Sequence, residues 1–287
     1  LVTLVSPKYG FLPYLSLNDI NPISSVGEYL NILYQNECKI KKESSEFLDK
    51  YTVLQLKSNN NILENTFLNI CEHILNKLGD NPALDDTITV LESIKKLFSK
   101  LLNNSSKTEL GLWGELFLIY FLKDYEYLID SWHKKNNDTF DFNDGINKIE
   151  VKTTIKSERK HNFSLNQLEN SISNSAVICS IMTSEIDMGF SIHFLIKEIS
   201  SKVSIDYKIK LDEKIIEVAG KDISLFKSKY DISSAKNSIK FYESSIVPSI
   251  KKENISKEVT KIKFVSSLES VEPIKIKDFN EGILLRF

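Results

Sequence analysis

The chain alternates between stretches in which apolar residues recur every three or four positions and stretches in which apolar and polar residues alternate. The first pattern predicts an amphipathic helix over 62–78 and a second that begins at Asp85 or Asp86 and runs to about 101. Before them, residues 1–60 combine turn-rich segments with β-like runs over 28–34 and 51–57. We therefore expect an accessory region over residues 1–104 in which strands precede helices.

A third predicted helix, from Ser105 to about Lys123, is apolar on nearly every side, which is typical of a helix buried in a core. Glu115 lies inside this apolar stretch, and Gly111 and Gly114 share its side of the helix. Two glycines there would let another backbone come close, despite their low helix propensity. A buried, ionised glutamate requires a partner, so Glu115 predicts a cation, a hydrogen-bond network or a metal beside it.

The pattern after this helix predicts strands over 126–133, 138–143 and 148–155, then a helix that starts at the capping box Ser164–Gln167. A strand over 176–182 and a helix over 190–199 follow, and the lysine-rich region 204–287 has further β-like runs. The sequence thus predicts an α/β fold with a mixed sheet. Its core would be residues 105–203, with β-rich additions over 1–104 and 204–287.

The dipeptide Asp144-Gly145 joins two of these predicted strands, and Asp-Gly between alternating runs is a strong hairpin signal. With these two residues at the turn, Asp141 pairs with Lys148 across the hairpin. One face would then be apolar and would carry Phe140, Phe142, Ile149 and Val151. The opposite face would carry Asp141, Lys148, Glu150 and Lys152. A shift of the register by one residue would exchange the two faces.

Asp141 and Glu150 become diagonal neighbours in this hairpin, roughly 5.5–8 Å apart at Cβ, so both carboxylates can reach one Mg²⁺. A divalent metal neutralises a phosphate and lowers the pKa of water, and a lysine such as Lys152 orients that water. The group therefore suits phosphodiester hydrolysis. The alternative is an exposed hairpin whose charged residues face solvent, because Glu-x-Lys alone is common.

The net charge of −2 means that any contact with a polyanion must come from a local patch. Such a patch follows the hairpin directly and consists of Lys156, Arg159, Lys160 and His161. We expect these residues to bind nucleic-acid phosphates that flank the one to be cut, and the alternative is a solvated loop. Basic residues elsewhere are almost all lysine, so readout of guanine by arginine is scarcely available.

The three cysteines are widely spaced, which favours a reducing, cytoplasmic location over a disulfide scaffold. No signal peptide is visible, and the longest apolar run, over 116–122, is far too short to cross a membrane. We therefore expect a cytoplasmic protein that has no membrane partner.

The arrangement of Asp141, Glu150-Val151-Lys152 and a glutamate on a preceding helix resembles the PD-(D/E)XK nuclease superfamily. The restriction-endonuclease-like core of that superfamily has the order αβββαβ, which is the order predicted here. The segments 111–116, 149–154 and 161–168 are most similar to a little-characterised bacterial branch found among phage-defence genes. Phe140 stands where the superfamily's name has a proline.

This resemblance implies a role for each residue. Asp141 and Glu150 would hold Mg²⁺, for which Mn²⁺ would substitute, Glu115 would bind or orient the metal's water shell, and Lys152 would position the attacking water. The implied activity is a Mg²⁺-dependent DNA endonuclease of restriction or anti-phage defence, working as a homodimer or with other defence proteins.

Three alternatives stay open. The first is that the chain is a non-catalytic DNA- or protein-binding subunit of a defence complex. The second is that it is a repair nuclease or junction resolvase. For Glu115 alone, the alternative is a purely structural salt bridge.

Overall fold

The computed structural model describes residues 2–4, 25–42, 45–58, 61–78, 84–99, 107–133, 139–169, 176–250, 255–256, 258–259, 262–275 and 282. The chain forms two compact units: residues 1–106 with 208–225, and residues 107–207 with 226–287. The division into 1–104, 105–203 and 204–287 stays a prediction, and residues 208–225 group with the N-terminal unit. Among the described residues, no helix is long and apolar enough to cross a membrane.

The first unit combines an antiparallel sheet with helices. Its strands, in the order β1-β4-β3-β2, are β1 (Val2–Leu4), β4 (Ser45–Leu56), β3 (Leu30–Lys42) and β2 (Ser25–Val26). The two predicted helices are confirmed as α1 (Asn61–Leu78) and α2 (Leu84–Ser99), and residue 101 lies outside the described residues. They meet through an edge-on contact of Phe67 and Phe98, whose ring centroids are 6.0 Å apart. Most of α7 (Ile205–Ala219) and the 3-10 helix η2 (Gly220–Leu225) complete the unit.

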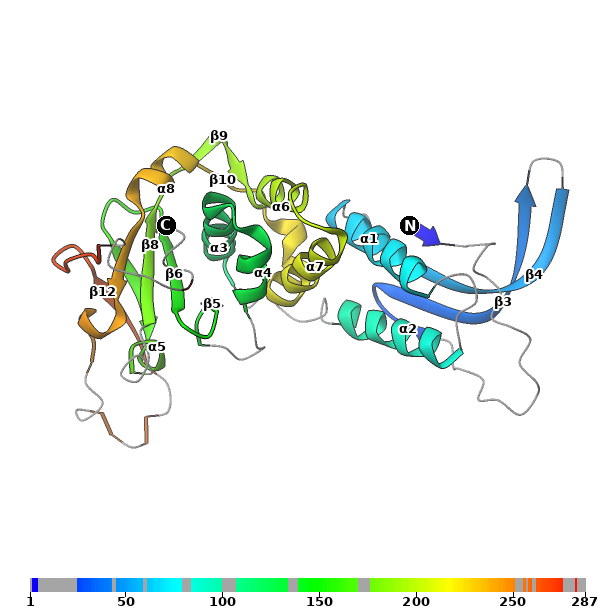
Figure 1. Ribbon diagram of the computed structural model, residues 1–287, viewed down its shortest axis with the longest axis horizontal. Helices are drawn as coiled ribbons and strands as arrows, with labels where there is room; N and C mark the ends of the chain where they lie inside the picture. The colour runs from blue at the N-terminus through cyan, green and yellow to red at the C-terminus, as the bar shows by residue number, and fades with distance from the viewer. Residues whose placement is uncertain are drawn as a thin grey trace. The chain divides into compact units, whose positions relative to one another are not determined.

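The second unit is built on a mixed sheet with the strand order β11-β8-β6-β5 (Figure 1). These strands are β11 (Lys240–Glu243), β8 (Ala176–Met182), β6 (Lys148–Thr154) and β5 (Phe142–Asn143). Strands β6 and β8 are parallel and are connected through β7 (Lys160–Ser164) and α5 (Leu165–Glu169). The two outer pairs, β11 with β8 and β5 with β6, are antiparallel. This confirms the predicted α/β class with a mixed sheet.

Helix α3 (Glu109–Leu122) is buried, as predicted, and lies against β6 (Figure 1). It begins at the N-cap Thr108, whose side chain accepts a hydrogen bond from the Gly111 amide at 3.2 Å. Its Trp113 indole donates to the Phe190 carbonyl at 2.7 Å, which joins α3 to the end of β9 (Glu185–Ser191). Next to it lies α6 (Ile192–Ser200), which confirms the helix predicted over 190–199.

The predicted strand over 126–133 is wrong, because α4 (Tyr125–Ser131) occupies that segment. Leu128 and Ile129 are fully buried on the helix and Trp132 directly after it, so tertiary packing outweighs the β propensity of these residues. The third strand of the core is β7, in a segment for which the sequence predicts a basic patch and no strand. The order α3, β5, β6, β7, α5, β8 nevertheless reproduces the predicted αβββαβ sequence of elements.

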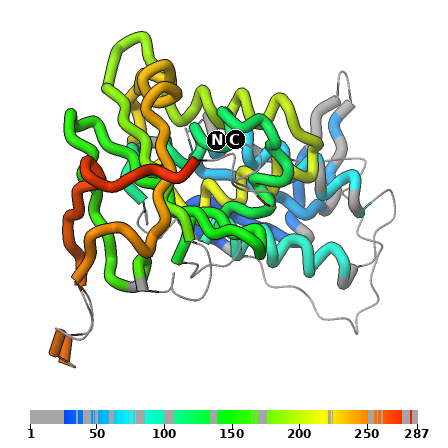
Figure 2. Tube along the Cα trace, turned by 60° about the vertical axis from the view of Figure 1, so that its left-hand side comes forward, coloured from blue at the N-terminus to red at the C-terminus, as the bar shows by residue number. Residues whose placement is uncertain are grey.

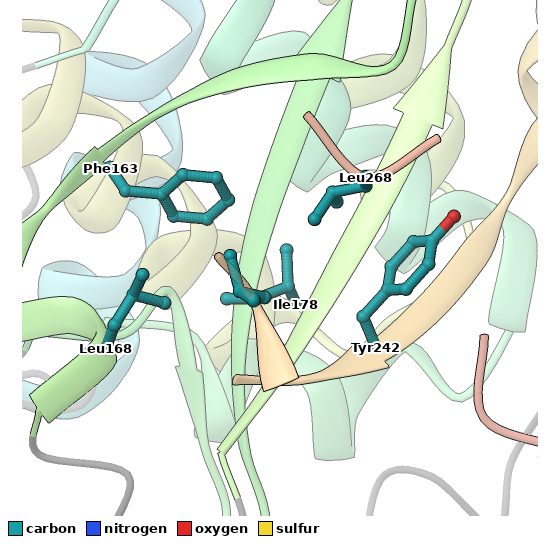
Figure 3. Packing of buried hydrophobic residues seen from close by; sticks show 6 residues of the cluster. Phe163, Leu168, Ile178, Tyr242 and Leu268 are labelled. Carbon is teal, nitrogen blue, oxygen red and sulfur yellow. The ribbon is translucent and has the colours of Figure 1, made fainter. Parts of the chain in front are cut away.

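The second unit also contains a two-stranded sheet, in which β7 pairs with β12 (Lys263–Ser267), and the helix α5. Strand β11, from late in the chain, lies beside β8 (Figure 2). An apolar cluster fills this side, and Figure 3 shows five of its side chains turned toward one another: Phe163, Leu168, Ile178, Tyr242 and Leu268. Val247 also belongs to the cluster. The second unit also contains β10 (Lys229–Tyr230), α8 (Ile232–Ser238) and the 3-10 helix η3 (Ser244–Ile246). The cluster fixes β8, and through it the neighbouring strand β6, from the side away from α3.

Candidate active site

The hairpin has a longer turn than predicted. Phe142 pairs with Ile149 and Asn143 with Lys148, so the predicted pairing of Asp141 with Lys148 is wrong by two residues. Because side chains alternate along a strand, a shift by two leaves the paired residues of β5 and β6 on their predicted faces, and Asp141 lies directly before β5. The shift also carries Asp141 toward Glu150: the amide of the next residue, Val151, donates to Asp141 Oδ2 at 2.8 Å.

The carboxylate of Asp144 explains the wider turn. It accepts the amides of Ile146 at 2.8 Å and Asn147 at 2.6 Å, and the hydroxyl of Tyr127 at 2.8 Å. Gly145 has a φ of 94°, a conformation that glycine adopts without steric penalty. Asp144 therefore stabilises a four-residue loop instead of the two-residue turn, and it is separate from the active-site carboxylates.

Gly114 brings α3 into close contact with β6. A Cβ atom at this position would lie 1.8 Å from Oγ1 of Thr153, so only glycine fits. This confirms the predicted close approach at Gly114, whereas Gly111 faces the Thr108 side chain of its own N-cap. The contact sets Glu115, the next residue of α3, beside the strand that carries Glu150 and Lys152.

Glu115 is buried and has three partners. Lys107 Nζ lies 2.8 Å from its Oε1, and its Oε2 lies 2.8 Å from His133 Nε2 and 2.9 Å from the Trp132 indole nitrogen. The predicted need for a cation and a hydrogen-bond network is thus confirmed. Burial acts to raise the pKa of Glu115, but the charge of Lys107 and the hydrogen bond with His133 outweigh it and hold the pKa below its usual range.

Lys107 also makes an ion pair with Asp141, through Oδ1, so its ammonium group lies between the two buried carboxylates. Burial and the nearby charge of Glu115 raise the pKa of Asp141 above its usual range. Burial would lower the pKa of Lys107, but the charges of Asp141, Glu115 and Glu150 outweigh it and raise this pKa. The lysine is therefore held in its charged form by the carboxylates that it neutralises.

Glu150 and Lys152 form a second, adjoining group on β6. Glu150 Oε1 accepts Lys152 Nζ at 2.7 Å and Gln167 Nε2 at 2.5 Å. The amide oxygen of Gln167 accepts the Ser164 amide at 2.9 Å, so the predicted capping box is confirmed and also reaches the site. Burial and the charge of Asp141 raise the pKa of Glu150 to about 7.

The donor atoms of Glu115, His133 and Asp141 all lie within 4.8 Å of one another. Two carboxylates and an imidazole form a donor set that suits a divalent metal, so the residues fit the metal that the family resemblance implies. Of the predicted ligands, Glu115 and Asp141 belong to this set, and Glu150 is turned toward Lys152 and Gln167 instead.

His133 and Lys107 belong to the site, although the sequence pattern did not predict either of them. His133 has a φ of 41°, in the left-handed region where non-glycine residues are uncommon, and its amide donates to the Asp141 carbonyl at 2.8 Å. Lys107 lies directly before the N-cap of α3, the helix that carries the buried Glu115. A lysine at this place in the sequence could have been predicted as the cationic partner of that glutamate. No signal in the local pattern identified His133.

The structure separates the four residues of the predicted basic cluster. Lys156 and Lys160 are exposed, and Lys160 pairs with Glu158 at 2.6 Å. Arg159 is buried and donates to the Ser180 carbonyl and hydroxyl at 2.9 and 2.7 Å.

His161 is also buried and lies 2.7 Å from the same Ser180 hydroxyl. Burial, with the charges of Lys152 and Arg159, lowers the pKa of His161 to about 3, so its imidazole is neutral at pH 7. Arg159 and His161 both tie β7 to β8, and only the two lysines present their charges to solvent.

Comparison with known proteins gives one match. Residues 16–269, which are most of the chain, match the model of the family described as "Putative PD-(D/E)XK family member" (DUF4420). No curated protein and no solved structure matched the chain. The match covers the helix, the hairpin and the strand that carry the site, and it agrees with the resemblance seen in the sequence. The chain belongs to the DUF4420 family and thereby to the PD-(D/E)XK group of proteins, which suggests a nuclease.

Proposed function

We propose that this protein is a Mg²⁺-dependent DNA endonuclease that hydrolyses phosphodiester bonds. The observation that carries the proposal is the buried group of Glu115 from α3, His133 and Asp141, whose donor atoms lie within 4.8 Å of one another. Glu150 and Lys152, which contact each other at 2.7 Å, adjoin this group on β6, where the Val151 amide between them donates to Asp141. Surface charges rarely converge in this way with three carboxylates buried, because each buried charge must find a partner. Membership of a PD-(D/E)XK family supports the same activity.

Glu115 and Asp141 would hold the metal, with His133 or Glu150 as a further ligand. A bound Mg²⁺ or Mn²⁺ supplies positive charge beside the phosphate and lowers the pKa of water. Carboxylate oxygens are ligands that suit both Mg²⁺ and Mn²⁺. The predicted ability of Mn²⁺ to substitute for Mg²⁺ follows from these carboxylates.

Lys152 would orient the attacking water and stabilise negative charge that develops on the phosphate. Its ammonium is held by the Glu150 carboxylate at 2.7 Å and lies 5.4 Å from the centre of the Phe163 ring. Gln167 keeps Glu150 in place from the other side, so the glutamate is fixed by two elements before substrate arrives. Gln167 is a positioning residue, because it acts through Glu150.

The first test is incubation of the purified chain with supercoiled plasmid and phage DNA. We expect cleavage in Mg²⁺ and in Mn²⁺, and complete loss of cleavage in excess EDTA. A four-way junction serves as a parallel substrate, and a strong preference for it over linear duplex would favour a junction resolvase. If no DNA is cut under any metal, and calorimetry detects no Mn²⁺ binding, the chain is better explained as a non-catalytic subunit.

We propose that Lys156 and Lys160, which are exposed and lie shortly after β6 in the chain, bind the DNA phosphates that flank the cleaved one. In an inactive Asp141→Asn background, Lys156→Ala and Lys160→Ala should each weaken DNA binding and reduce the slope of log K against log salt by about 1. Lys202→Ala, at an exposed position elsewhere in the same unit, is the control and should leave the slope unchanged. Unchanged slopes in the two test variants would mean that DNA lies elsewhere.

A defence role is part of the proposal and rests on the resemblance to proteins encoded among phage-defence genes. Challenge of cells with phage, comparing survival with the wild type and with Asp141→Asn, tests this role.

A homodimer would set one centre on each DNA strand, and light scattering with and without DNA measures that assembly. The cysteines Cys38, Cys71 and Cys179 are free, which agrees with a reducing cytoplasm.

A further inference from the structure

The ammonium group of Lys107 occupies the place between Glu115 and Asp141. It lies 2.8 Å from Glu115 Oε1 and also makes an ion pair with Asp141 Oδ1. The carboxylates are deeply buried, with side chains 1% and 3% exposed, whereas the lysine side chain is 26% exposed. Lys107 is thus the member of the cluster that reaches solvent, and it lies outside the helix, directly before the N-cap Thr108.

Two buried carboxylates this close together require positive charge, since an uncompensated buried charge is strongly destabilising. Lys107 supplies that charge without a metal. Its ammonium is a compact point charge on a flexible stem, so it can leave without moving the backbone of α3. Glu115 keeps a second set of partners on Oε2, from Trp132 and His133, and Asp141 keeps the Val151 amide on Oδ2. The two carboxylates therefore stay anchored when the lysine departs.

A divalent metal bound by Glu115 and Asp141 would compete with the Lys107 ammonium group for the space between the two carboxylates. The oxygens that the lysine uses, Glu115 Oε1 and Asp141 Oδ1, are the ones not taken up by Trp132, His133 and the Val151 amide. A divalent metal ion and the Lys107 ammonium group cannot both occupy the space between these oxygens, because both are cations that would lie within a few ångströms of each other.

We propose that Lys107 is a displaceable counter-cation of the active site, which stabilises Glu115 and Asp141 without metal and is expelled when the divalent ion binds. This inference rests on the metal site of the proposed function. The role of Lys107 differs from that of Lys152, since Lys107 competes with the metal and Lys152 assists hydrolysis. Metal affinity would then be set by the competition between the two cations.

The experiment compares Mn²⁺ binding by calorimetry in the wild type, Lys107→Gln and Lys107→Arg. Removing the competing charge in Lys107→Gln should tighten Mn²⁺ binding about 10- to 100-fold, as expected if the lysine occupies the site 90–99% of the time. Lys107→Arg should weaken Mn²⁺ binding, because the guanidinium fork matches carboxylates better than an ammonium. Lys202→Gln, at an exposed position after α6, is the control and should bind Mn²⁺ like the wild type.

Melting curves in EDTA and in Mn²⁺ give a second readout that does not depend on cleavage. Lys107→Gln should melt below the wild type in EDTA and gain more from Mn²⁺, because the metal replaces the missing charge. If Lys107→Gln fails to fold in EDTA, Lys107→Arg keeps the inference testable through its weaker metal binding.

Three outcomes separate the inference from the proposed function. Equal Mn²⁺ affinity in the wild type and in both Lys107 variants overturns the counter-cation role but leaves the metal-dependent nuclease untouched. Weaker binding in Lys107→Gln than in the wild type also overturns it, since the lysine would then support the site. Absence of Mn²⁺ binding in all the folded proteins overturns the inference and the metal site together.

Discussion

Replacement of Asp141 by asparagine is expected to reduce DNA cleavage by about 10²- to 10³-fold, the size of effect seen when one preorganised electrostatic group is removed from an active site. The substitution is nearly isosteric, and the side-chain oxygen of asparagine can still accept the Val151 amide that Asp141 Oδ2 accepts at 2.8 Å. The negative charge that would hold the metal is lost. Cleavage of supercoiled plasmid in Mg²⁺ measures the effect.

The control for this variant is Asp187→Asn, which removes one carboxylate from an exposed position on β9. It should cut DNA at the wild-type rate. Lys152→Met should also lose cleavage but keep Mn²⁺ binding, whereas Asp141→Asn should lose both, because only the aspartate is a proposed ligand. Wild-type cleavage by Asp141→Asn would show that the catalytic centre has been assigned to the wrong residues.

Substitution of Gly114 by alanine is expected to destabilise the second unit by about 2 kcal/mol, within the usual range for overpacking a core. The new methyl group would lie 1.8 Å from Thr153 Oγ1 and 3.0 Å from its Cβ, so α3 and β6 must move apart. Alanine has the higher helix propensity, by about 1 kcal/mol, but the collision outweighs that gain. Urea-induced unfolding measures the loss, and cleavage should fall too, because the movement separates Glu115 from Glu150.

Two further variants isolate the collision. Gly111→Ala changes a glycine of the same helix whose Cβ would approach only Thr108 Oγ1, at 3.1 Å, so its effect should be small. Thr153→Ala removes a buried hydroxyl that has no hydrogen-bond partner among the described residues, and combined with Gly114→Ala it should restore most of the lost stability. If Gly114→Ala is as stable as the wild type, helix and strand are not held at this separation.

The site contains two adjoining groups with different roles. Lys107, Glu115 and Asp141 form the part where a metal would be held, and Glu150, Lys152 and Gln167 form the part that would direct water. Asp141 connects them, because it binds Lys107 through one oxygen and the Val151 amide of β6 through the other. This connection explains why the charge of Asp141 raises the pKa of Glu150.

The sequence by itself determined the parts that depend on local pattern. The apolar stretch around Glu115 predicted a buried helix and a partner for its carboxylate, and both are confirmed in α3. Alternation along the hairpin predicted which side chains share a face with Asp141. The register is wrong by two residues, which keeps the predicted faces of the paired residues because the side-chain period of a strand is also two; Asp141 itself lies before β5, so its face stays a prediction.

The tertiary structure alone decided which residues distant in the chain meet the carboxylates. His133 reaches Glu115 because α4 replaces the expected strand and ends shortly before His133, whose amide donates to the Asp141 carbonyl. The sequence predicted that Arg159 binds phosphate, yet its guanidinium group is buried and donates to the carbonyl and hydroxyl of Ser180 on β8. Periodicity records only whether a position is buried, whereas the partner of a buried charge is set by the packing of separate elements, which no local pattern encodes.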